Sequence, residues 1–197
     1  MINRWEFWNA NADEVEQFAD LTATKSLITG PAAEPNRFRQ VHIVRHEDRI
    51  YYLKEFQHTQ WKNRWRCRLT APHCQLDGER EFGIAQALTE RGFRVARPIA
   101  SGRRGGASFY LCAELPGKSL RERLAAGTLR AHLAFAAARF AGAILRSGVR
   151  LPDLSMDHIF VEDDTQQFAV IDLHNGSLTS TKTIRPLVRI LRRFRRS

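Results

Sequence analysis

The sequence lacks the features of a protein that spans a membrane or is secreted. It contains no run of 18 apolar residues, whereas a helix that crosses a bilayer needs about 20. The first residues, MINRWEFWNANADEVEQF, have no apolar core of the kind found in secretory signal peptides. We therefore expect a cytoplasmic protein.

Cysteine is also scarce. Three cysteines, Cys67, Cys74 and Cys112, stand at unpatterned spacings and include no CxxC pair. Such a set gives neither a disulfide framework nor a zinc site of the usual kind. We expect three free thiols in a reducing compartment.

Positive charge, in contrast, is abundant. The 197 residues carry a net charge of +10, and the final segment TIRPLVRILRRFRRS contains six arginines and no acid. Its apolar residues follow one helical stripe: Ile184, Leu187, Val188, Leu191 and Phe194. A basic amphipathic helix of this kind suits an anionic membrane surface. The alternative is that this helix packs its apolar stripe on the rest of the protein while its arginines are merely solvated. Nucleic-acid binding is a weaker option because no nucleic-acid motif accompanies the charge.

The hydrophobic pattern predicts an α+β protein. Hydrophobic residues make up 43% of the chain, enough for one compact domain or two lobes that share a cleft. Helices are expected over 10–20, 78–93 and 130–148, β-hairpins over 38–56 and 159–173, and a strand over 108–115. The alanine-rich helix 130–148 is apolar enough to be mostly buried. This order predicts an N-terminal lobe over 1–113, a hinge over 114–118 and a C-terminal lobe over 119–197.

Charged residues stand at points where phosphoryl transfer would need them. That reaction requires a cation for the phosphates, a carboxylate for Mg²⁺ and a second carboxylate for the attacking hydroxyl. Protein kinases supply these groups in a fixed order along the chain. The same order is found here: Lys54 ends a strand, Glu81 lies on the next helix, Asp153 follows the helix 130–148, His158 stands five residues later, and Asp172 follows a strand.

Each of these residues also has a simpler interpretation. Lys54 could be a solvated residue at the edge of a sheet. Glu81 could be an exposed helix charge, in which case Glu79 is a possible substitute as the partner of Lys54. Asp153 could cap a turn, and His158 could be a core histidine. Asp172 is harder to explain in this way, because it directly follows the apolar stretch FAVI and a carboxylate beside a buried strand needs a partner.

Several segments together resemble the bacterial lipopolysaccharide kinases, the Kdo and heptose kinases of the inner core, which are related to protein kinases. These segments are YYLKEFQHTQWKNRWRCRLTA (51–71), EREFGIAQALTERGFRVARPIASG (79–102), AELPGKSL (113–120) and IDLH (171–174). A histidine at the position of His158 is a further similarity to that family. The combination over 38–178 is fairly specific, although each motif alone is weak.

The resemblance implies a small two-lobed protein-kinase-like fold, with an N-terminal antiparallel sheet plus helix and a truncated helical C-terminal lobe. It implies ATP-dependent phosphorylation of a sugar hydroxyl on the lipopolysaccharide core. Lys54, held by Glu81, would bind the nucleotide phosphates, and backbone at Glu114 and Leu115 would meet adenine. Asp172 with His158 would bind Mg²⁺, and Asp153 would be the catalytic base.

The resemblance further implies a glycolipid acceptor. We expect a monomer that does not bind nucleic acid. The basic tail would hold the enzyme on the cytoplasmic face of an anionic membrane.

The sequence also departs from the kinase pattern. Leu151-Pro152 replaces the usual His-Arg before the catalytic aspartate, no glycine-rich loop precedes Lys54, and only 25 residues follow Asp172. Magnesium prefers oxygen ligands, so an alternative role for His158 is a hydrogen bond to Asp153 or to a phosphate. Three interpretations therefore stay open: a minimal glycolipid kinase, a non-catalytic kinase-like binding or regulatory module, and a kinase for a protein substrate.

Overall fold

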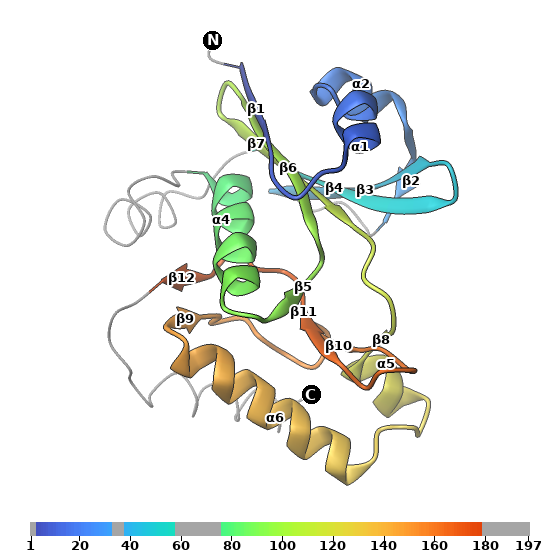
Figure 1. Ribbon diagram of the computed structural model, residues 1–197, viewed down its shortest axis with the longest axis vertical. Coiled ribbons are helices and arrows are strands. Elements are labelled where there is room, and N and C mark those ends of the chain that lie inside the picture. Colours follow the sequence, from blue (N-terminus) through green and yellow to red (C-terminus); the bar gives the residue numbers. More distant parts are fainter. Residues whose placement is uncertain (1–2, 33–37, 58–75, 179–197) are drawn as a thin grey trace.

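A six-stranded antiparallel sheet forms the upper part of the molecule in Figure 1, in the order β1-β6-β7-β4-β3-β2. The computed structural model describes residues 3–32, 38–57 and 76–178. The strands of this sheet are β1 (Asn3–Phe7), β2 (Ile28–Pro31), β3 (Arg39–His46), β4 (Arg49–Phe56), β6 (Pro98–Arg104) and β7 (Ala107–Ala113). The hairpin predicted over 38–56 is formed by β3 and β4. Arg39 pairs with Phe56 at its open end, and His46 pairs with Arg49 next to the turn.

Strand β4 separates the two faces of this sheet. Alternate side chains of a strand point to opposite faces, and Tyr51 and Leu53 are fully buried in one apolar cluster. Tyr52 and Lys54 therefore project from the other face. This alternation directs Lys54 toward the second half of the chain.

Two short helices, α1 (Ala12–Gln17) and α2 (Leu21–Ser26), lie over one face of the sheet (Figure 1). Helix α1 is the helix expected over 10–20, although it ends earlier, at Gln17, and α2 was not predicted. The Asp20 side chain accepts a hydrogen bond from the Ala23 N–H at 2.8 Å, so it caps a second helix instead of continuing the first.

Helix α4 (Asp77–Glu90) packs on the opposite face of the sheet (Figure 1). Gly78 allows close packing, because a Cβ there would lie 3.0 Å from the Phe109 backbone nitrogen. The helix ends before Gly92, whose φ of +78° is the left-handed conformation that favours glycine. The helix predicted over 78–93 is therefore present, and it ends three residues earlier than predicted.

The lower part of the molecule combines small sheets with two helices. One sheet has the order β5-β11-β10-β8, and β12 pairs with β9. The elements are β5 (Arg94–Val95), β8 (Lys118–Ser119), α5 (Leu120–Ala125), α6 (Ala131–Arg146), β9 (Val149–Arg150), β10 (Ile159–Val161), β11 (Phe168–Val170) and β12 (Ser177–Leu178). β5 runs parallel to β11 and so links the two halves.

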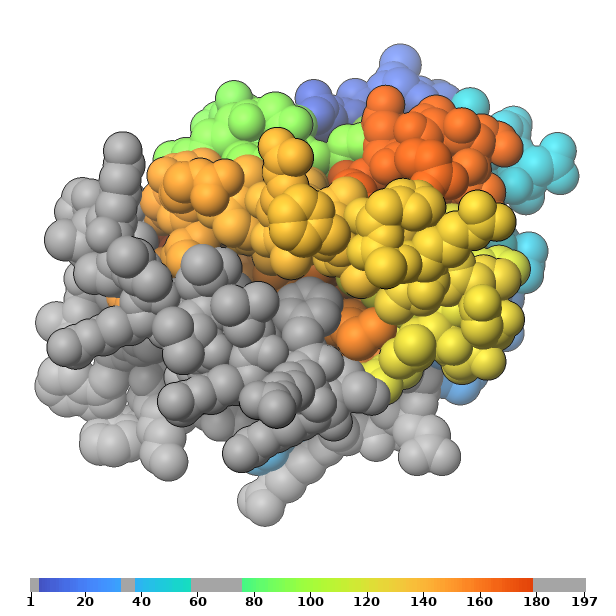
Figure 2. Space-filling model, turned by 90° about the horizontal axis from the view of Figure 1, so that it is seen from below, coloured from blue at the N-terminus to red at the C-terminus, as the bar shows by residue number. Residues whose placement is uncertain are grey.

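Helix α6 is less buried than its composition predicted. One stripe, including Leu133, Ala137 and Ile144, lies in the core, but Phe135 is 68% exposed. Figure 2 shows α6 along one face of the molecule.

The predicted α+β class, with an antiparallel sheet plus helix, is confirmed. The lobe boundaries at 1–113, 114–118 and 119–197 stay predictions. No helix in the described part of the chain is long and apolar enough to cross a membrane. Cys112 is a buried free thiol, whereas Cys67, Cys74 and the basic tail lie outside the described residues.

Candidate active site

Lys54 and Glu81 form an ion pair between β4 and α4. Their side chains are 12% and 1% exposed. Burial on its own would lower the pKa of Lys54, but the negative charge of Glu81 outweighs burial and raises that pKa. Lys54 is therefore charged at neutral pH and held in one position.

Glu79, the alternative partner for Lys54, lies elsewhere. Its carboxylate accepts hydrogen bonds from Arg103, at 2.9 Å from Nε and 2.7 Å from Nη2. Two residues along a helix correspond to about 200° of rotation, so Glu79 and Glu81 cannot face the same neighbour.

Asp172 lies just after β11, with a φ of +61°. That conformation is uncommon for a residue other than glycine and clusters at functional sites. Its carboxylate is 2.5 Å from Arg39 Nη1, 2.8 Å from His174 Nδ1 and 3.4 Å from His158 Nε2. Burial alone would raise the pKa of Asp172, but the hydrogen bond from His174 and the charges of Lys54, His174 and Arg39 hold it well below its usual range. Asp172 is thus a fixed, ionised carboxylate.

Asp153 is joined to Asp172 through two side chains. Asn175 Nδ2 donates to Asp153 Oδ2 at 2.5 Å and lies 3.0 Å from His174 Nε2. His174 Nδ1 in turn meets Asp172. The loop after Asp172 therefore links both aspartates in one polar chain.

His158 lies between the same two aspartates. Its Nδ1 is 2.9 Å from the backbone carbonyl oxygen of Asp153, which requires Nδ1 to carry the proton. Its Nε2 then faces Asp172. His158 thus makes a hydrogen bond to Asp153, one of the alternatives considered, while it stays beside Asp172.

A cavity of about 480 Å³ opens beside these groups. Five of the residues singled out in the sequence line it: Lys54, Glu114, Leu115, His158 and Asp172. Its apolar wall includes Val41, Ala96, Ala113 and Ile171. Glu81 lies behind Lys54. Asp153 is not among the lining residues, and it is linked to Asp172 through Asn175 and His174. A cavity of this size with convergent charges is typical of a small-molecule site.

The segment 114–115 supplies polar backbone to one edge of the cavity. The Glu114 N–H is occupied, because it donates to the Ile50 carbonyl at 2.9 Å. Within the described residues, the Glu114 carbonyl and the Leu115 N–H have no hydrogen-bond partner. These two groups could meet the edge of a flat heterocycle.

The charged end of the cavity fits a divalent cation. Glu81, Asp172 and His174 offer ligand atoms within 4.8 Å of one another. Glu81 Oε2 is buried without a hydrogen-bond partner in the described part of the chain, and such an atom favours a nearby cation. The carboxylate oxygens match Mg²⁺ better than the histidine nitrogens do.

Three residues of this site were not identified from the sequence. Arg39 stands 133 positions before Asp172, so no local pattern could associate them. No catalytic or metal-binding role was predicted for His174 or Asn175. The motif IDLHNG gave the only available signal for both, since they directly follow Asp172.

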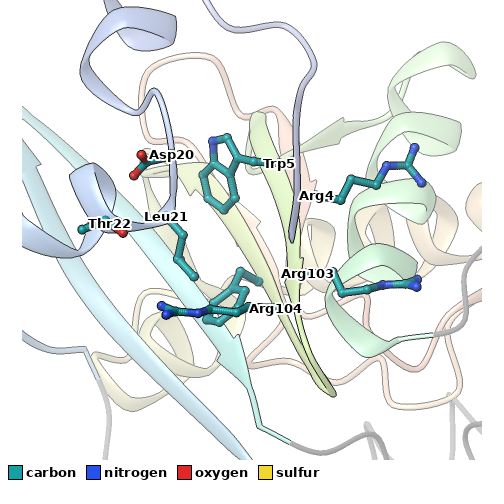
Figure 3. Close-up of a pocket in the computed structure, with 8 residues that line it drawn as sticks. Arg4, Trp5, Asp20, Leu21, Thr22, Arg103 and Arg104 are labelled. Atoms are coloured by element: carbon teal, nitrogen blue, oxygen red, sulfur yellow. The ribbon is translucent and has the colours of Figure 1, made fainter. Parts of the chain in front are cut away.

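A smaller cavity of about 310 Å³ lies elsewhere on the upper part of the molecule. Figure 3 shows Trp5 and Leu21 beside each other near Arg104, whereas Arg4 and Arg103 extend the other way. Arg103 is paired with Glu79. The charged groups of this cavity therefore do not converge, unlike those around Lys54.

Residues 32–197 match the model of the lipopolysaccharide kinase (Kdo/WaaP) family. The chain belongs to that family. The resemblance seen in the sequence is thereby confirmed, and membership of a kinase family supports a phosphotransferase activity. The comparison with curated proteins gave no match.

Solved structures show the fold of this lipopolysaccharide kinase family member. WaaP in complex with acyl carrier protein is similar with a TM-score of 0.69 and 19% identity, over 96% of this chain and 80% of that chain. A structure of WbdD is similar with a TM-score of 0.56 and 18% identity, over 82% of this chain and 35% of that chain. The predicted kinase-like fold is confirmed.

Proposed function

We propose that this protein transfers the γ-phosphoryl group of ATP to a sugar hydroxyl of the lipopolysaccharide inner core. Membership of the lipopolysaccharide kinase family supports the reaction class and a glycolipid acceptor. The observation that carries the proposal is the convergence of Lys54, paired with Glu81, and of Asp172 on one cavity, with Asp153 linked to it.

Lys54 would bind the phosphates of ATP. Its ammonium is charged and fixed by Glu81, and Lys54 lines the cavity. Adenine would lie at the other end, where the Glu114 carbonyl and Leu115 N–H offer one acceptor and one donor. Placing a charged group before the substrate arrives reduces the reorganisation needed in the transition state.

Asp153 would orient the acceptor hydroxyl and accept its proton. The Asn175 amide donates to one carboxylate oxygen, and this fixes the direction of the carboxylate. A positioned base of this kind raises rates by about 10²–10⁴-fold.

Asp172 would hold Mg²⁺, with His158 beside it and with Glu81 and His174 within reach. The bound metal ion would neutralise charge on the phosphates. Arg39 and His174 keep Asp172 ionised and in place.

The net charge of +10 favours association of the enzyme with an anionic surface. The basic tail would hold the protein on the cytoplasmic face of the membrane, next to a lipid-linked acceptor. We propose that the enzyme is a monomer and that it does not bind nucleic acid.

A non-catalytic binding or regulatory module is the second candidate. Leu151, two positions before Asp153, is 7% exposed and belongs to the apolar core, so it contributes packing where kinases have a polar residue. Such a module would bind a ligand in the cleft without transferring phosphate. A third candidate is a kinase for a protein substrate.

Incubation of the full chain with radiolabelled ATP, Mg²⁺ and purified inner-core glycolipid tests the proposal. Label on a core sugar supports it. Magnesium-dependent ATP binding without any transfer supports the binding module, and label on an added protein substrate alone supports the third candidate.

A further inference from the structure

A basic cavity of about 590 Å³ lies between α5, the start of α6 and the turn that joins β10 to β11. Its lining includes the cationic residues Lys118, Arg123 and Arg130, together with His132. Asp163 is the one carboxylate among the described residues that line it. Figure 2 shows α5 and the start of α6, in yellow, on the surface next to the β10–β11 segment in red-orange.

Arg123 is the buried member of this group. Its side chain is 8% exposed, and Nη2 donates to the Val161 carbonyl at 3.1 Å and to Asp163 Oδ1 at 2.5 Å. Arg123 Nε is buried and has no acceptor among the described residues. An unsatisfied buried donor is costly, so this group indicates that an acceptor belongs in the cavity.

The N-terminus of α6 provides a second, independent source of positive potential. Arg130 is its N-cap, but no side chain caps the helix, and its first turn contains no acidic residue. The first N–H groups of a helix have no partner within it and attract anions. Because Arg130, His132 and Leu133 line the cavity, this end of the 16-residue helix lies at its wall.

Neighbouring acids balance only part of the positive charge, and Glu122 interacts electrostatically with Lys118. No ion pair is found for Lys118 or Arg130 in the part of the chain that the structure describes. Asp163 pairs with Arg123, but its side chain is 63% exposed, which weakens the pair by solvent screening. The cavity therefore keeps a net positive charge.

We infer that this cavity is an anion site that binds a phosphoryl group. Lys118 and Arg130 would meet its oxygens at the mouth, and Arg123 with the start of α6 would meet them inside. Arginine and lysine together with helix N–H groups form a frequent combination in phosphate recognition. The inference does not depend on the proposed kinase reaction.

The site lies behind the cleft that contains Lys54. Glu122 lines that cleft, while the next residue, Arg123, lines the basic cavity. Likewise Phe160 faces the cleft, while the carbonyl of Val161 accepts from Arg123. Helix α5 and strand β10 therefore separate the two sites, and an anion bound here would fix one wall of the cleft.

Titration of the isotope-labelled full chain with inorganic phosphate, followed by NMR, tests the inference. We expect shifts of the amide signals of Gly127, Thr128 and His132. The double variant Lys118→Gln/Arg130→Gln should bind phosphate roughly tenfold more weakly, since two charged contacts are lost. Arg45→Gln/Arg104→Gln removes the same charge from exposed positions elsewhere and should bind as the wild type does.

Equal affinity of the wild type and Lys118→Gln/Arg130→Gln, or shifts confined to residues around Lys54, would overturn the inference. Magnesium-dependent ATP binding at Lys54 is measured separately, so failure of the anion site and failure of the proposed kinase reaction can be distinguished.

Vesicles identify the source of the phosphoryl group. Phosphatidylcholine vesicles with and without phosphatidylglycerol are offered to the wild type and to both double variants. If only Lys118→Gln/Arg130→Gln binds the anionic vesicles more weakly than the wild type does, the phosphoryl group belongs to a lipid headgroup. Site-specific phosphate binding with equal vesicle binding by all three proteins indicates a free phosphorylated compound. Absence of site-specific binding to either probe contradicts the inference.

Discussion

The Lys54 ammonium and the Glu81 carboxylate form an ion pair that the fold almost completely encloses, with 12% and 1% of the side chains exposed. Lys54 comes from β4 and Glu81 from α4, so the pair fixes the helix against the sheet. The same Glu81 carboxylate accepts a hydrogen bond from the Leu173 N–H at 3.3 Å. One acidic residue thus connects the upper sheet, α4 and the loop that carries Asp172.

Glu81→Gln should destabilise the protein by about 3 kcal/mol, because it leaves the Lys54 charge buried without its partner. Urea unfolding at pH 7 measures the change. Glu90→Gln, at the exposed end of the same helix, should change the free energy of unfolding by less than about 0.5 kcal/mol. Equal stability of the two variants would show that Glu81 contributes no more than a surface charge.

Asn175→Ala should lower kcat for phosphoryl transfer by roughly tenfold or more and leave the KM for ATP nearly unchanged. Asn175 contacts Asp153 directly, which would act on the acceptor, and reaches Asp172 only through His174. Steady-state kinetics with the glycolipid acceptor provide the measurement, and Gln57→Ala, which removes an exposed amide, is the control. An unchanged kcat would separate Asn175 from the positioning of Asp153.

Glu14 should make stability fall at acid pH. It is fully buried. Burial alone would raise its pKa, but hydrogen bonds from Arg97, the Asn11 backbone and Tyr51, together with the charge of Arg97, lower it from 4.5 to about 2. A lowered pKa means that the folded state favours the ionised form, so the stabilisation is present above pH 4.5 and is lost as the pH falls toward 2.

The size of this effect is about 3 kcal/mol, from about 1.4 kcal/mol per pH unit. Chemical unfolding of the wild type and Glu14→Gln between pH 7 and pH 2 should show a difference that shrinks through this window. Glu16→Gln, on the exposed side of the same helix, should follow the wild type throughout. A constant difference between wild type and Glu14→Gln would contradict the assignment.

Gly117→Ala should destabilise the protein by at least about 2 kcal/mol. Its φ is +99°, and a Cβ there would lie 2.3 Å from the Val161 carbonyl oxygen. Because Gly117 lines the Lys54 cavity, ATP binding should weaken as well. Thermal unfolding with and without ATP measures both effects. Gly106→Ala, where no atom lies within 4 Å of the added Cβ, should behave as the wild type does.

Local patterns carried much of the information on the fold. The alternation of residues in β4 predicted a strand, and the helical spacing over 78–93 predicted a helix. These two elements carry Lys54 and Glu81. The short strand β1 was missed, because it is defined by pairing with β6, about a hundred residues later. Pairing over such distances depends on tertiary packing, which short-range periodicity does not encode.

The candidate site was predictable only in part for the same reason. Lys54, Glu81, Asp153 and Asp172 belong to motifs with a characteristic order. Arg39 has no such motif, and its role beside Asp172 follows from the packing of β3 against a loop 133 residues away. The role of Asn175 likewise follows from the folded structure, in which its amide lies between Asp153 and His174.

The central claim is that the cleft transfers phosphate with Asp153 as its base. Transfer of label from ATP to purified inner-core glycolipid by the wild type, Asp153→Asn and Asp157→Asn tests it most directly. Asp157 is an exposed aspartate of the same loop that pairs with Arg121. We predict that Asp153→Asn loses at least about a hundredfold in rate while Asp157→Asn transfers label as the wild type does. Equal transfer by wild type and Asp153→Asn, or no transfer by the wild type, would contradict the claim.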